Sequence, residues 1–565
     1  MGFDVLLDQA GSLGRFQILQ IAFFFVTSMI TYTHILLENF TAAIPGHRCW
    51  VPLLDNHTTS GNDSDILSQD ALLRVSIPLD SNLRPEKCRR FIHPQWQLLY
   101  LNGTSPSTNE PDTEPCVDGW VYDQSSFSST IVTKWDLVCE FQSLKSVVQT
   151  LFMSGSLLGG LMFGRLSDRY GRKAIYTWCL LQTAIADTCA IFAPTFVVFC
   201  IFRFLAGLTT INIMTNAFIL ATEWTVPKLQ YIGITLILCS YSIGQMLLGG
   251  LAFAIQDWYT LHLTVSIPLF VLSLLSRRLV ESARWLVTTN QLDEGTKALR
   301  RVAHINGKKS AGEILTIETS HKCLLLVLLL KFVRSAMQEE LNKAQTKTSV
   351  IHLLRAPKLR MIICFLSFIR LGASVPFMGL ILNLQDLGSS IFLFQVLFGA
   401  ITFISRCSAH LIMKHMDRRI NQSLFFFLVG LCILVNTFLS QEMQTLRVVL
   451  ATLGIGTVSA ANATFFVHAL ELTPTTFRST TAGINNVFSR MGSVLAPLLM
   501  TLVVYSPHLP WIMYGVFPIL AGLIVFCLPE TRNRPLPNTI QDVENDTKES
   551  RKVKEEDTFI KVTQF

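Results

Sequence analysis

Long apolar runs separated by short polar segments make up most of the chain. About twelve of these runs approach the ~20 residues that a helix needs to cross a bilayer, and 50% of the 565 residues are hydrophobic while only 15% are charged. This pattern is typical of an all-α membrane protein rather than of a soluble enzyme. We predict spans near residues 16–36, 145–166, 174–194, 196–220, 231–254, 258–276, 360–384, 390–413, 422–440, 446–469, 480–505 and 509–528.

The spans fall into two groups of six, which predicts two six-helix halves with a large loop between helices 1 and 2. No cleavage site follows the first span, so we interpret it as a retained helix. An apolar stretch at 319–332 is too short to span; it lies at the interface, packs on the bundle or is a gene-model insertion. The expected domains are a first half at 1–276 that includes a loop at 37–144, a central loop at 277–359, a second half at 360–528 and a disordered tail at 529–565.

Lysine and arginine near short loops indicate the cytoplasmic side of the membrane. They cluster at 164–173, at 414–419, in the central loop and in the tail. Both termini are therefore expected in the cytoplasm, and segment 37–144 outside the cell. Because orientation accounts for the net charge of +7, the charge does not indicate a nucleic-acid partner.

The composition of segment 37–144 supports this orientation independently. It carries four glycosylation sequons, at Asn39, Asn56, Asn62 and Asn102, and four cysteines, Cys49, Cys88, Cys116 and Cys139. An even set of cysteines in an oxidising compartment predicts two disulfides. Three pairings of the four are open, and the sequence does not choose among them.

A short basic motif occurs twice, once in each half. The first copy is Gly164–Lys173 and the second, weaker copy is Lys414–Arg419. Such a repeat is typical of secondary transporters built from two halves. Asp168 in the first copy can pair with a basic side chain or a helix N-terminus. One copy alone fits a plain positively charged turn, whereas two copies favour a state-dependent clasp between helices.

Arginines inside the predicted spans are the strongest candidates for function, because a charge at membrane depth is costly and is usually paired or functional. We expect Arg203, in the fourth span, to form a structural ion pair with Asp168 or Glu223. We expect Arg406 and Arg490 to face an interior cavity suited to an anionic ligand.

The alternative for Arg406 and Arg490 is internal ion pairing, for which Asp187 is the candidate partner. Arg370, in the seventh span, is more ambiguous, since it can extend to the membrane surface. Aromatic residues near these arginines, Phe377, Phe466 and Tyr241, can stack on a flat apolar ligand, and Gln245 shares a helix face with Tyr241.

The sequence offers no chemistry for catalysis. It has no Gly-x4-Gly-Lys-Ser/Thr nucleotide loop, no Gly-x-Ser-x-Gly motif and no metal-ligand spacing around its histidines. We therefore expect no cofactor, no metal and no catalytic residue.

The motifs together resemble the major facilitator superfamily. They are Gly164–Lys173, Arg203-Phe-Leu, Glu281-Ser-Ala-Arg284-Trp-Leu, Glu471-Leu-x-Pro-x-x-x-Arg478 and Pro529-Glu530-Thr531-Arg532. Asn39-Phe-Thr-Ala-Ala-Ile-Pro and the cysteine-rich first loop resemble the organic anion branch of solute carrier family 22. The resemblance implies a 12-helix fold and a conformational clasp formed by Gly164, Asp168, Arg169, Gly171, Arg172, Arg203, Glu223, Glu281, Arg284, Asp417, Arg418, Glu471 and Arg478.

The resemblance also implies a substrate site. Arg490 falls where organic anion transporters carry a cavity arginine, Arg406 where many carry a lysine, and Phe466 and Tyr241 at aromatic positions. This chain departs from the family at several positions, which makes one wall less polar and suits a sterol body. The implied substrate-binding residues are Arg490, Arg406, Phe466, Phe377, Met378, Tyr241, Gln245, His34, Ile35, Asn462 and Asn486.

The expected function is a plasma-membrane uniporter or exchanger of amphipathic organic anions, working by alternating access. The two ends of the chain are similar to those of a steroid-conjugate transporter of this family, so we expect steroid sulfates and glucuronides as substrates. The expected partners are these anions, the lipid bilayer and, through the C-terminal Thr563-Gln564-Phe565, a PDZ-domain protein. The alternatives are a cation or zwitterion carrier, which Arg490 disfavours, a transport-dead receptor or scaffold, and a membrane enzyme.

Overall fold

The computed structural model describes residues 14–55, 69–80, 84–99, 112–307, 355–387, 390–440, 442–474 and 477–532, and the single residues Leu7, Gly11, Pro537 and Val543. The chain forms two compact units. The first, the helical unit, combines Met1–Asn39, Ser146–Phe253 and His262–Phe565; the second, the loop unit, combines Phe40–Lys145 and Ala254–Leu261.

The helical unit is built from long apolar helices, as the apolar runs predict. Eleven segments of the described chain are long and apolar enough to span a membrane, and α22 is a shorter apolar helix. The first half contains α2 (Arg15–Leu36), α3 (Glu38–Thr41), α7 (Ser143–Tyr170), α8 (Arg172–Ile191), α9 (Phe196–Glu223), α10 (Pro227–Ala254) and α11 (Trp258–Ser276). The second half contains α17 (Pro357–Leu382), α18 (Ile391–His415), α19 (Arg418–Phe438), α20 (Gln444–Leu472), α21 (Arg478–Met500) and α22 (Leu509–Val525). The predicted fold class is confirmed.

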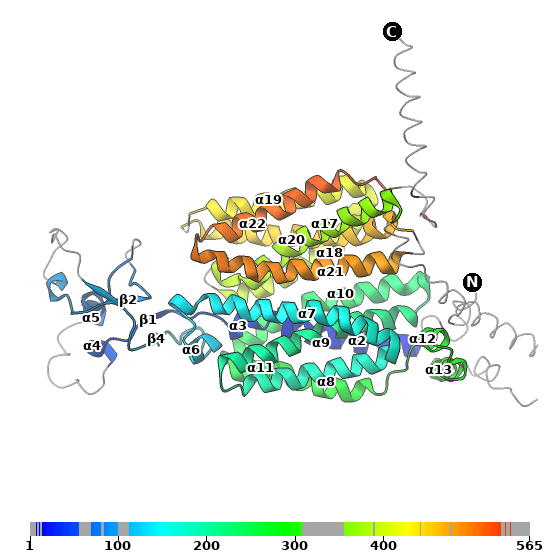
Figure 1. The fold of residues 1–565 in the computed structure, drawn as a ribbon, viewed down its shortest axis with the longest axis horizontal. Helices are drawn as coiled ribbons and strands as arrows, with labels where there is room; N and C mark the ends of the chain where they lie inside the picture. The colour runs from blue at the N-terminus through cyan, green and yellow to red at the C-terminus, as the bar shows by residue number, and fades with distance from the viewer. Residues whose placement is uncertain are drawn as a thin grey trace, which may run out of the picture. The chain divides into compact units, whose positions relative to one another are not determined.

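Each half packs around its own apolar core. Figure 1 shows the helices of the second half, α17 to α22, lying together, and α19 packs against both α20 and α22. Phe24, Tyr176 and Ile213 contribute to the core of the first half, and Phe426 and Phe465 to that of the second. Two short helices, α12 (Ala283–Thr288) and α13 (Leu292–Ile305), follow α11 and join a further apolar cluster.

Glycines let α7 and α9 approach backbone to backbone. A Cβ atom on Gly159 would lie 1.9 Å from the carbonyl oxygen of Leu208, and one on Gly207 would lie 2.1 Å from that of Phe152. Such contacts between small residues are how helices associate where lipid removes the hydrophobic driving force.

The helical unit has two ends, the motif end and the loop end. The motif end is where α7 meets α8 and α18 meets α19, so it carries both copies of the basic motif. The loop end is the opposite one, where α2 and α17 end and α9 and α18 begin.

The loop unit is small and cross-linked. Strand β1 (His47–Cys49) pairs antiparallel with β4 (Trp120–Tyr122), and β2 (Arg89–Phe91) with β3 (Thr113–Pro115). Short helices α4 (Pro52–Asp55), α5 (Gln69–Ser76) and α6 (Ile131–Trp135) accompany the strands, as do the 3-10 turns η2 (Trp96–Leu99) and η3 (Cys139–Phe141).

Two disulfides hold the loop unit together. They join Cys49 to Cys116 and Cys88 to Cys139. The prediction that all four cysteines are bonded is confirmed, and the structure selects one of the three open pairings. The sequons at Asn56, Asn62 and Asn102, the stretch 319–332 and the C-terminal Thr563-Gln564-Phe565 lie outside the described residues, so those predictions stand untested.

Candidate functional site

Three arginines from the second half gather at mid-helix positions. They are Arg370 on α17, Arg406 on α18 and Arg490 on α21, and Arg370 is close enough to the other two to be repelled by both. No ion pair between these guanidinium groups and a carboxylate occurs within the described chain. The structure therefore adds Arg370, which the sequence left ambiguous, to the two predicted cavity cations. We call the three the arginine cluster.

Each member of the arginine cluster has polar or aromatic neighbours in place of an acid. Arg406 donates to the carbonyl oxygen of Leu238 at 2.8 Å. Arg370 donates to Oδ1 of Asn462 at 2.5 Å. Arg490 reaches Oγ1 of Thr215 at 3.5 Å, the outer limit of a hydrogen bond.

Two donors of the arginine cluster are buried without a hydrogen-bond partner, Nε of Arg370 and Nη1 of Arg490. Unsatisfied buried donors are rare in native structures. Gly160 on α7 lets the Arg490 side chain lie close against that helix, since a Cβ atom there would be only 3.1 Å from Nε of the arginine. The cluster is thus equipped to receive an additional acceptor.

Aromatic rings line the arginine cluster. The Arg406 guanidinium lies 5.0 Å from the ring centre of Tyr241, and that of Arg370 lies 4.8 Å from that of Phe466. Tyr241 makes a perpendicular contact with Tyr32 at 4.7 Å and a tilted one with Phe377 at 6.0 Å. Arginine-aromatic stacking at these distances is favourable. Aromatic rings therefore flank the cations, and we call Tyr32, Tyr241, Phe377 and Phe466 the aromatic wall.

Tyr32 is a site residue that the sequence did not indicate. It interacts electrostatically with both Arg406 and Arg490 and lies against Tyr241. The sequence does contain a feature that could have indicated Tyr32. The first span carries Thr27, Ser28 and Thr31 within its apolar run, and these hydroxyl residues mark a polar helix face that is turned away from lipid.

The predicted substrate-binding residues divide into two groups. The structure brings Arg490, Arg406, Tyr241, Phe377, Asn462 and Phe466 together around the arginine cluster. The other five are placed differently: His34, Ile35 and Gln245 are buried, Met378 is half-buried and Asn486 is exposed on α21. Within the described residues, no hydrogen bond joins these five to the arginine cluster.

The predicted partners of Arg203 are wrong. Arg203 pairs with Glu38 at 3.0 Å and with Asp187 at 2.8 Å, and all three are buried. It lies two turns into α9, at the loop end, whereas Glu223 ends that helix twenty residues later, ~30 Å away. Asp187 is therefore committed to Arg203 and is not the partner of the arginine cluster.

Glycosylation at Asn39 is contradicted by the structure. Asn39 is 1% exposed, and its amide donates to the carbonyl oxygen of Ile381 at 2.7 Å and to Oε1 of Gln395 at 3.3 Å. A buried amide nitrogen that makes these bonds cannot carry a glycan. Asn39 instead joins the two halves at the loop end.

The first copy of the basic motif is organised by Glu281, which follows α11. Its carboxylate accepts from the backbone N–H groups of Arg172 and Lys173, both at 3.1 Å, at the N-terminus of α8. A carboxylate is stabilised there by the helix dipole. Gly171 has φ +102° and leaves room for this contact, since a Cβ atom would lie 2.5 Å from Oε2 of Glu281.

The side chains around Glu281 tie the motif to neighbouring elements. Arg172 pairs with Asp168 at 2.6 Å and reaches Glu223 at 3.7 Å. Nε1 of Trp285 on α12 donates to the backbone oxygen of Asp168 at 2.8 Å. The Asp168 carboxylate is 63% exposed and bonds within its own segment, so the bonds to other elements come from Glu281, Arg172 and Trp285.

The second copy repeats this construction with Glu530, which follows α22. Its carboxylate accepts from the backbone N–H groups of Arg418 at 3.0 Å and Arg419 at 2.9 Å, at the N-terminus of α19. Burial raises the pKa of Glu530, but these N–H groups, with those of Arg532 and Thr531, outweigh burial and lower it. The sequence places Glu530 in a motif, but only the tertiary contacts show that it is the counterpart of Glu281.

The remaining predicted clasp residues have smaller roles. Arg418 pairs with Glu471 at 3.4 Å and Asp417 with Arg532 at 3.3 Å. Arg478 donates to the carbonyl oxygen of Leu470 at 3.1 Å, the Arg169 guanidinium lies 5.4 Å from the Tyr170 ring, and Arg284 interacts electrostatically with Glu223. A Cβ atom on Gly164 would meet nothing within 4 Å.

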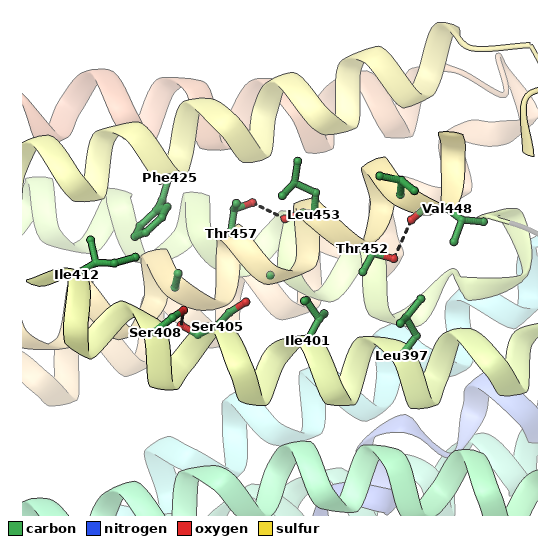
Figure 2. A pocket seen from close by; sticks show the side chains of 13 residues that line it. Leu397, Ile401, Ser405, Ser408, Ile412, Phe425, Val448, Thr452, Leu453 and Thr457 are labelled. Carbon is green, nitrogen blue, oxygen red and sulfur yellow. Dashed lines mark hydrogen bonds between the residues drawn. The ribbon is translucent and has the colours of Figure 1, made fainter. Parts of the chain in front are cut away.

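A cavity of about 470 Å³ lies between α18, α19 and α20, and it contains none of the arginine cluster. Figure 2 shows its wall of aliphatic side chains, including Leu397 and Ile401, with Phe425 at one end. Its threonine hydroxyls are used within their own helix: Thr452 donates to Val448 and Thr457 to Leu453, each at 2.8 Å. The residues that line this cavity include no cationic side chain, so it offers no counter-charge to an anion.

Comparisons with known proteins agree with this architecture. Residues 126–497 match the family described as Major Facilitator Superfamily. The chain is 97% identical to the steroid transmembrane transporter SLC22A24 of Oryctolagus cuniculus and 66% identical to that of Homo sapiens, each over 100% of both chains. It is 60% identical to solute carrier family 22 member 10 of Homo sapiens over 97% of this chain and 99% of that one.

Solved structures resemble the fold. A partially occluded inward-open structure of the xylose transporter XylE from E. coli matches 92% of this chain and 100% of its own, with a TM-score of 0.58 and 13% sequence identity. An inward-open structure of the same transporter matches 74% of this chain and 92% of its own, with a TM-score of 0.55 and 15% identity. At these identities the similarity concerns the fold alone.

Proposed function

From the premise that this chain belongs to the major facilitator superfamily, and within it to solute carrier family 22, we propose that it carries steroid sulfates and glucuronides across the plasma membrane by alternating access. The observation that carries the proposal is the arginine cluster. Its three cations have no carboxylate partner in the described chain, two of its donors are buried and unsatisfied, and an aromatic wall lies beside it.

The charge of the arginine cluster indicates the charge of the substrate. A guanidinium at membrane depth needs a counter-charge or a water-filled space, and a sulfate or carboxylate accepts two parallel bonds from a guanidinium. The substrate anion supplies the missing acceptor for Arg490 and Arg370. A cation carrier would need an acid in place of these arginines.

The aromatic wall indicates the shape of the substrate body. Tyr32, Tyr241, Phe377 and Phe466 present flat rings at the edge of the arginine cluster, and flat apolar bodies stack on such rings. A steroid conjugate combines one anionic group with a rigid ring system. The relatives named as steroid transmembrane transporters support this substrate class.

The two halves touch at the loop end in this structure. Asn39 bonds to Ile381 and Gln395 across the halves, and the rings of Phe253 and Phe392 lie 5.8 Å apart. We propose that these contacts close the loop end in one state of the transport cycle and break in the other. Glu281 and Glu530 act within their own halves and keep each half rigid while it moves.

The direct test of this function is uptake of a labelled steroid sulfate into vesicles that contain the full chain, with and without a trapped counter-anion. Uptake above that of empty vesicles is expected, and stimulation by the counter-anion identifies an exchanger. A protein that reaches the membrane but gives no uptake is a receptor or scaffold, for which the PDZ-ligand end would then be the feature to examine.

The motif residues are expected to control rate rather than substrate choice. Asp168→Asn removes the pair with Arg172 at the motif end, far from the arginine cluster, and Glu281→Gln removes the charge at the start of α8. Both changes should slow turnover, with the larger effect for Glu281→Gln because it weakens two backbone bonds. Initial rates for several steroid conjugates check this; a reordered substrate ranking at normal turnover would contradict it.

We propose that both termini are cytoplasmic and that the loop unit faces outside the cell. Its disulfides fit an oxidising compartment, and sequons remain at Asn56, Asn62 and Asn102. Glycosidase treatment of intact cells should increase gel mobility of the wild-type chain, and the triple change of these asparagines to glutamine should remove the shift. Labelling of this segment only after permeabilisation would refute the orientation.

A further inference from the structure

Helices α10 and α18 belong to different halves and lie directly against each other. A Cβ atom on Gly399 of α18 would lie 2.9 Å from the backbone oxygen of Ser242 on α10. Nearer the loop end, the rings of Phe253 on α10 and Phe392 on α18 are 5.8 Å apart. Helix backbones approach this closely where a glycine leaves out the side chain. We call this contact between the halves the α10–α18 interface.

The α10–α18 interface continues toward the motif end with Arg406, which donates to the carbonyl oxygen of Leu238 at 2.8 Å. Along the interface the residue numbers rise on α10 as they fall on α18, so the two helices run antiparallel. The next residue on each helix is a cysteine, Cys239 after Leu238 and Cys407 after Arg406. The interface therefore brings a cysteine of each half to the same level.

The two cysteines are in contact and are not bonded. Both are free, with Cys239 half-buried and Cys407 exposed. Their thiols interact with each other directly. Neighbouring cysteines that can be oxidised to a disulfide and reduced again are the usual form of a redox sensor. An accessible thiol beside a second thiol has this form, and here the two thiols come from different halves.

We propose that Cys239 and Cys407 form an oxidation site, at which hydrogen peroxide converts the two thiols into a disulfide that links α10 to α18 and stops the transport cycle. The more exposed sulfur, that of Cys407, attacks one peroxide oxygen. The O–O bond breaks, one water leaves and Cys407 becomes a sulfenic acid. The sulfur of Cys239 then attacks that of Cys407, the S–S bond forms, the S–O bond breaks and a second water leaves. Peroxide is reduced as the thiols are oxidised, and both thiol hydrogens leave in the waters.

The position of the disulfide explains why it would stop transport. A disulfide keeps its two Cα atoms within ~4.4–6.8 Å of each other, so α10 and α18 could neither separate nor slide at this level. Alternating access requires the two halves to move relative to each other. The oxidised chain would be held in the arrangement of this structure. This consequence rests on the proposed function, whereas formation of the disulfide does not.

The first test detects the disulfide itself in the full-length chain. Membranes that contain the protein are treated with hydrogen peroxide, the remaining thiols are blocked with a maleimide, and the digested chain is analysed by mass spectrometry. A peptide that links Cys239 to Cys407 should appear after peroxide and disappear on reduction with dithiothreitol. The Cys49–Cys116 disulfide of the loop unit is the internal reference, since its linked peptide should be present without peroxide as well.

The second test measures uptake of a labelled steroid sulfate before and after peroxide. Uptake by the wild-type chain should fall to the fraction of chains that remain unlinked, and dithiothreitol should restore it. Cys239→Ser and Cys407→Ser should each transport normally and keep their uptake after peroxide. Cys364→Ser is the matched control, because Cys364 is also a free, exposed cysteine of the second half; this variant should remain as sensitive as the wild type. Untreated chains given dithiothreitol alone show any effect of reducing the loop unit.

Absence of the linked peptide after peroxide overturns the proposal. So does full uptake by a preparation in which most chains are linked, or wild-type sensitivity in the serine variants. Either serine variant alone suffices if the other is not expressed. A chain without steroid-sulfate uptake would defeat the proposed function, while the linked peptide would still decide whether the oxidation site exists. Normal uptake without a linked peptide would defeat the oxidation site alone.

Discussion

Arg490→Ala is expected to nearly abolish uptake of sulfated and glucuronidated steroids while the protein still reaches the cell surface. Arg490 has no acid partner in the described chain, a buried unsatisfied donor and a hydrogen bond only at 3.5 Å. Its removal therefore breaks no strong internal contact. It does remove a charge-assisted bond to the substrate, of about 1.5–3 kcal/mol, or about one to two decades in affinity.

The measurement is concentration-dependent uptake corrected for surface protein, and two variants serve as comparisons. Arg490→Lys keeps the charge but loses the planar fork, so uptake should fall only in part. Arg406→Ala should have a smaller effect than Arg490→Ala, because Arg406 is already engaged by Leu238 and Tyr241. A well-expressed Arg490→Ala chain with wild-type affinity would show that this arginine is structural.

The sequence predicts the helices well because one free-energy term, the transfer of apolar side chains into the bilayer, decides where membrane spans form. Every apolar run of about 20 residues must cross or lie in the bilayer, whatever its neighbours are. The same energy makes an arginine within a run conspicuous, which is why Arg406 and Arg490 could be found in advance. The double basic motif was visible as a repeat, and the structure shows why: both copies begin a helix that a downstream glutamate caps.

Partners of buried charges could not be predicted, because they depend on which helices are neighbours and at what depth. Arg203 and Glu223 are on one helix, yet they lie at opposite ends of it. Glu38 precedes Arg203 by 165 residues and meets it at 3.0 Å. Nothing in the local sequence of either residue records that contact. For the same reason Asn39, in a perfect sequon, is a buried contact between the halves rather than a glycan site.

The residues of the aromatic wall could be predicted from the sequence only in part. Phe466 and Tyr241 could be assigned by resemblance, but 39 phenylalanines and 10 tyrosines in the chain make any single ring uninformative by itself. Tyr32 and Arg370 were identified as site residues only when their neighbours were known. Arg370 in particular differs from a lipid-facing arginine by its bond to Asn462 and by its position over Phe466.

Arg203→Ala is expected to remove most mature protein from the cell surface, in contrast to Arg490→Ala. Arg203 is 1% exposed and pairs with both Glu38 and Asp187. Its loss leaves two buried carboxylates without their cation, at a cost of about 3–5 kcal/mol, a large part of the 5–15 kcal/mol that stabilises a typical protein. Arg203→Lys should rescue little, because one ammonium cannot span both carboxylates and the His34 carbonyl.

Replacing Arg203, Glu38 and Asp187 together by neutral side chains distinguishes the effect of lost packing from the effect of unbalanced charge. Arg203→Met combined with Glu38→Gln and Asp187→Asn removes all three charges at similar volume, and such exchanges are often tolerated where the single change is not. Surface protein should therefore recover in the triple variant, as measured by surface biotinylation and by thermal stability in detergent. Normal surface levels for Arg203→Ala alone, or no recovery in the triple variant, would mean that charge balance is not what this cluster contributes to folding.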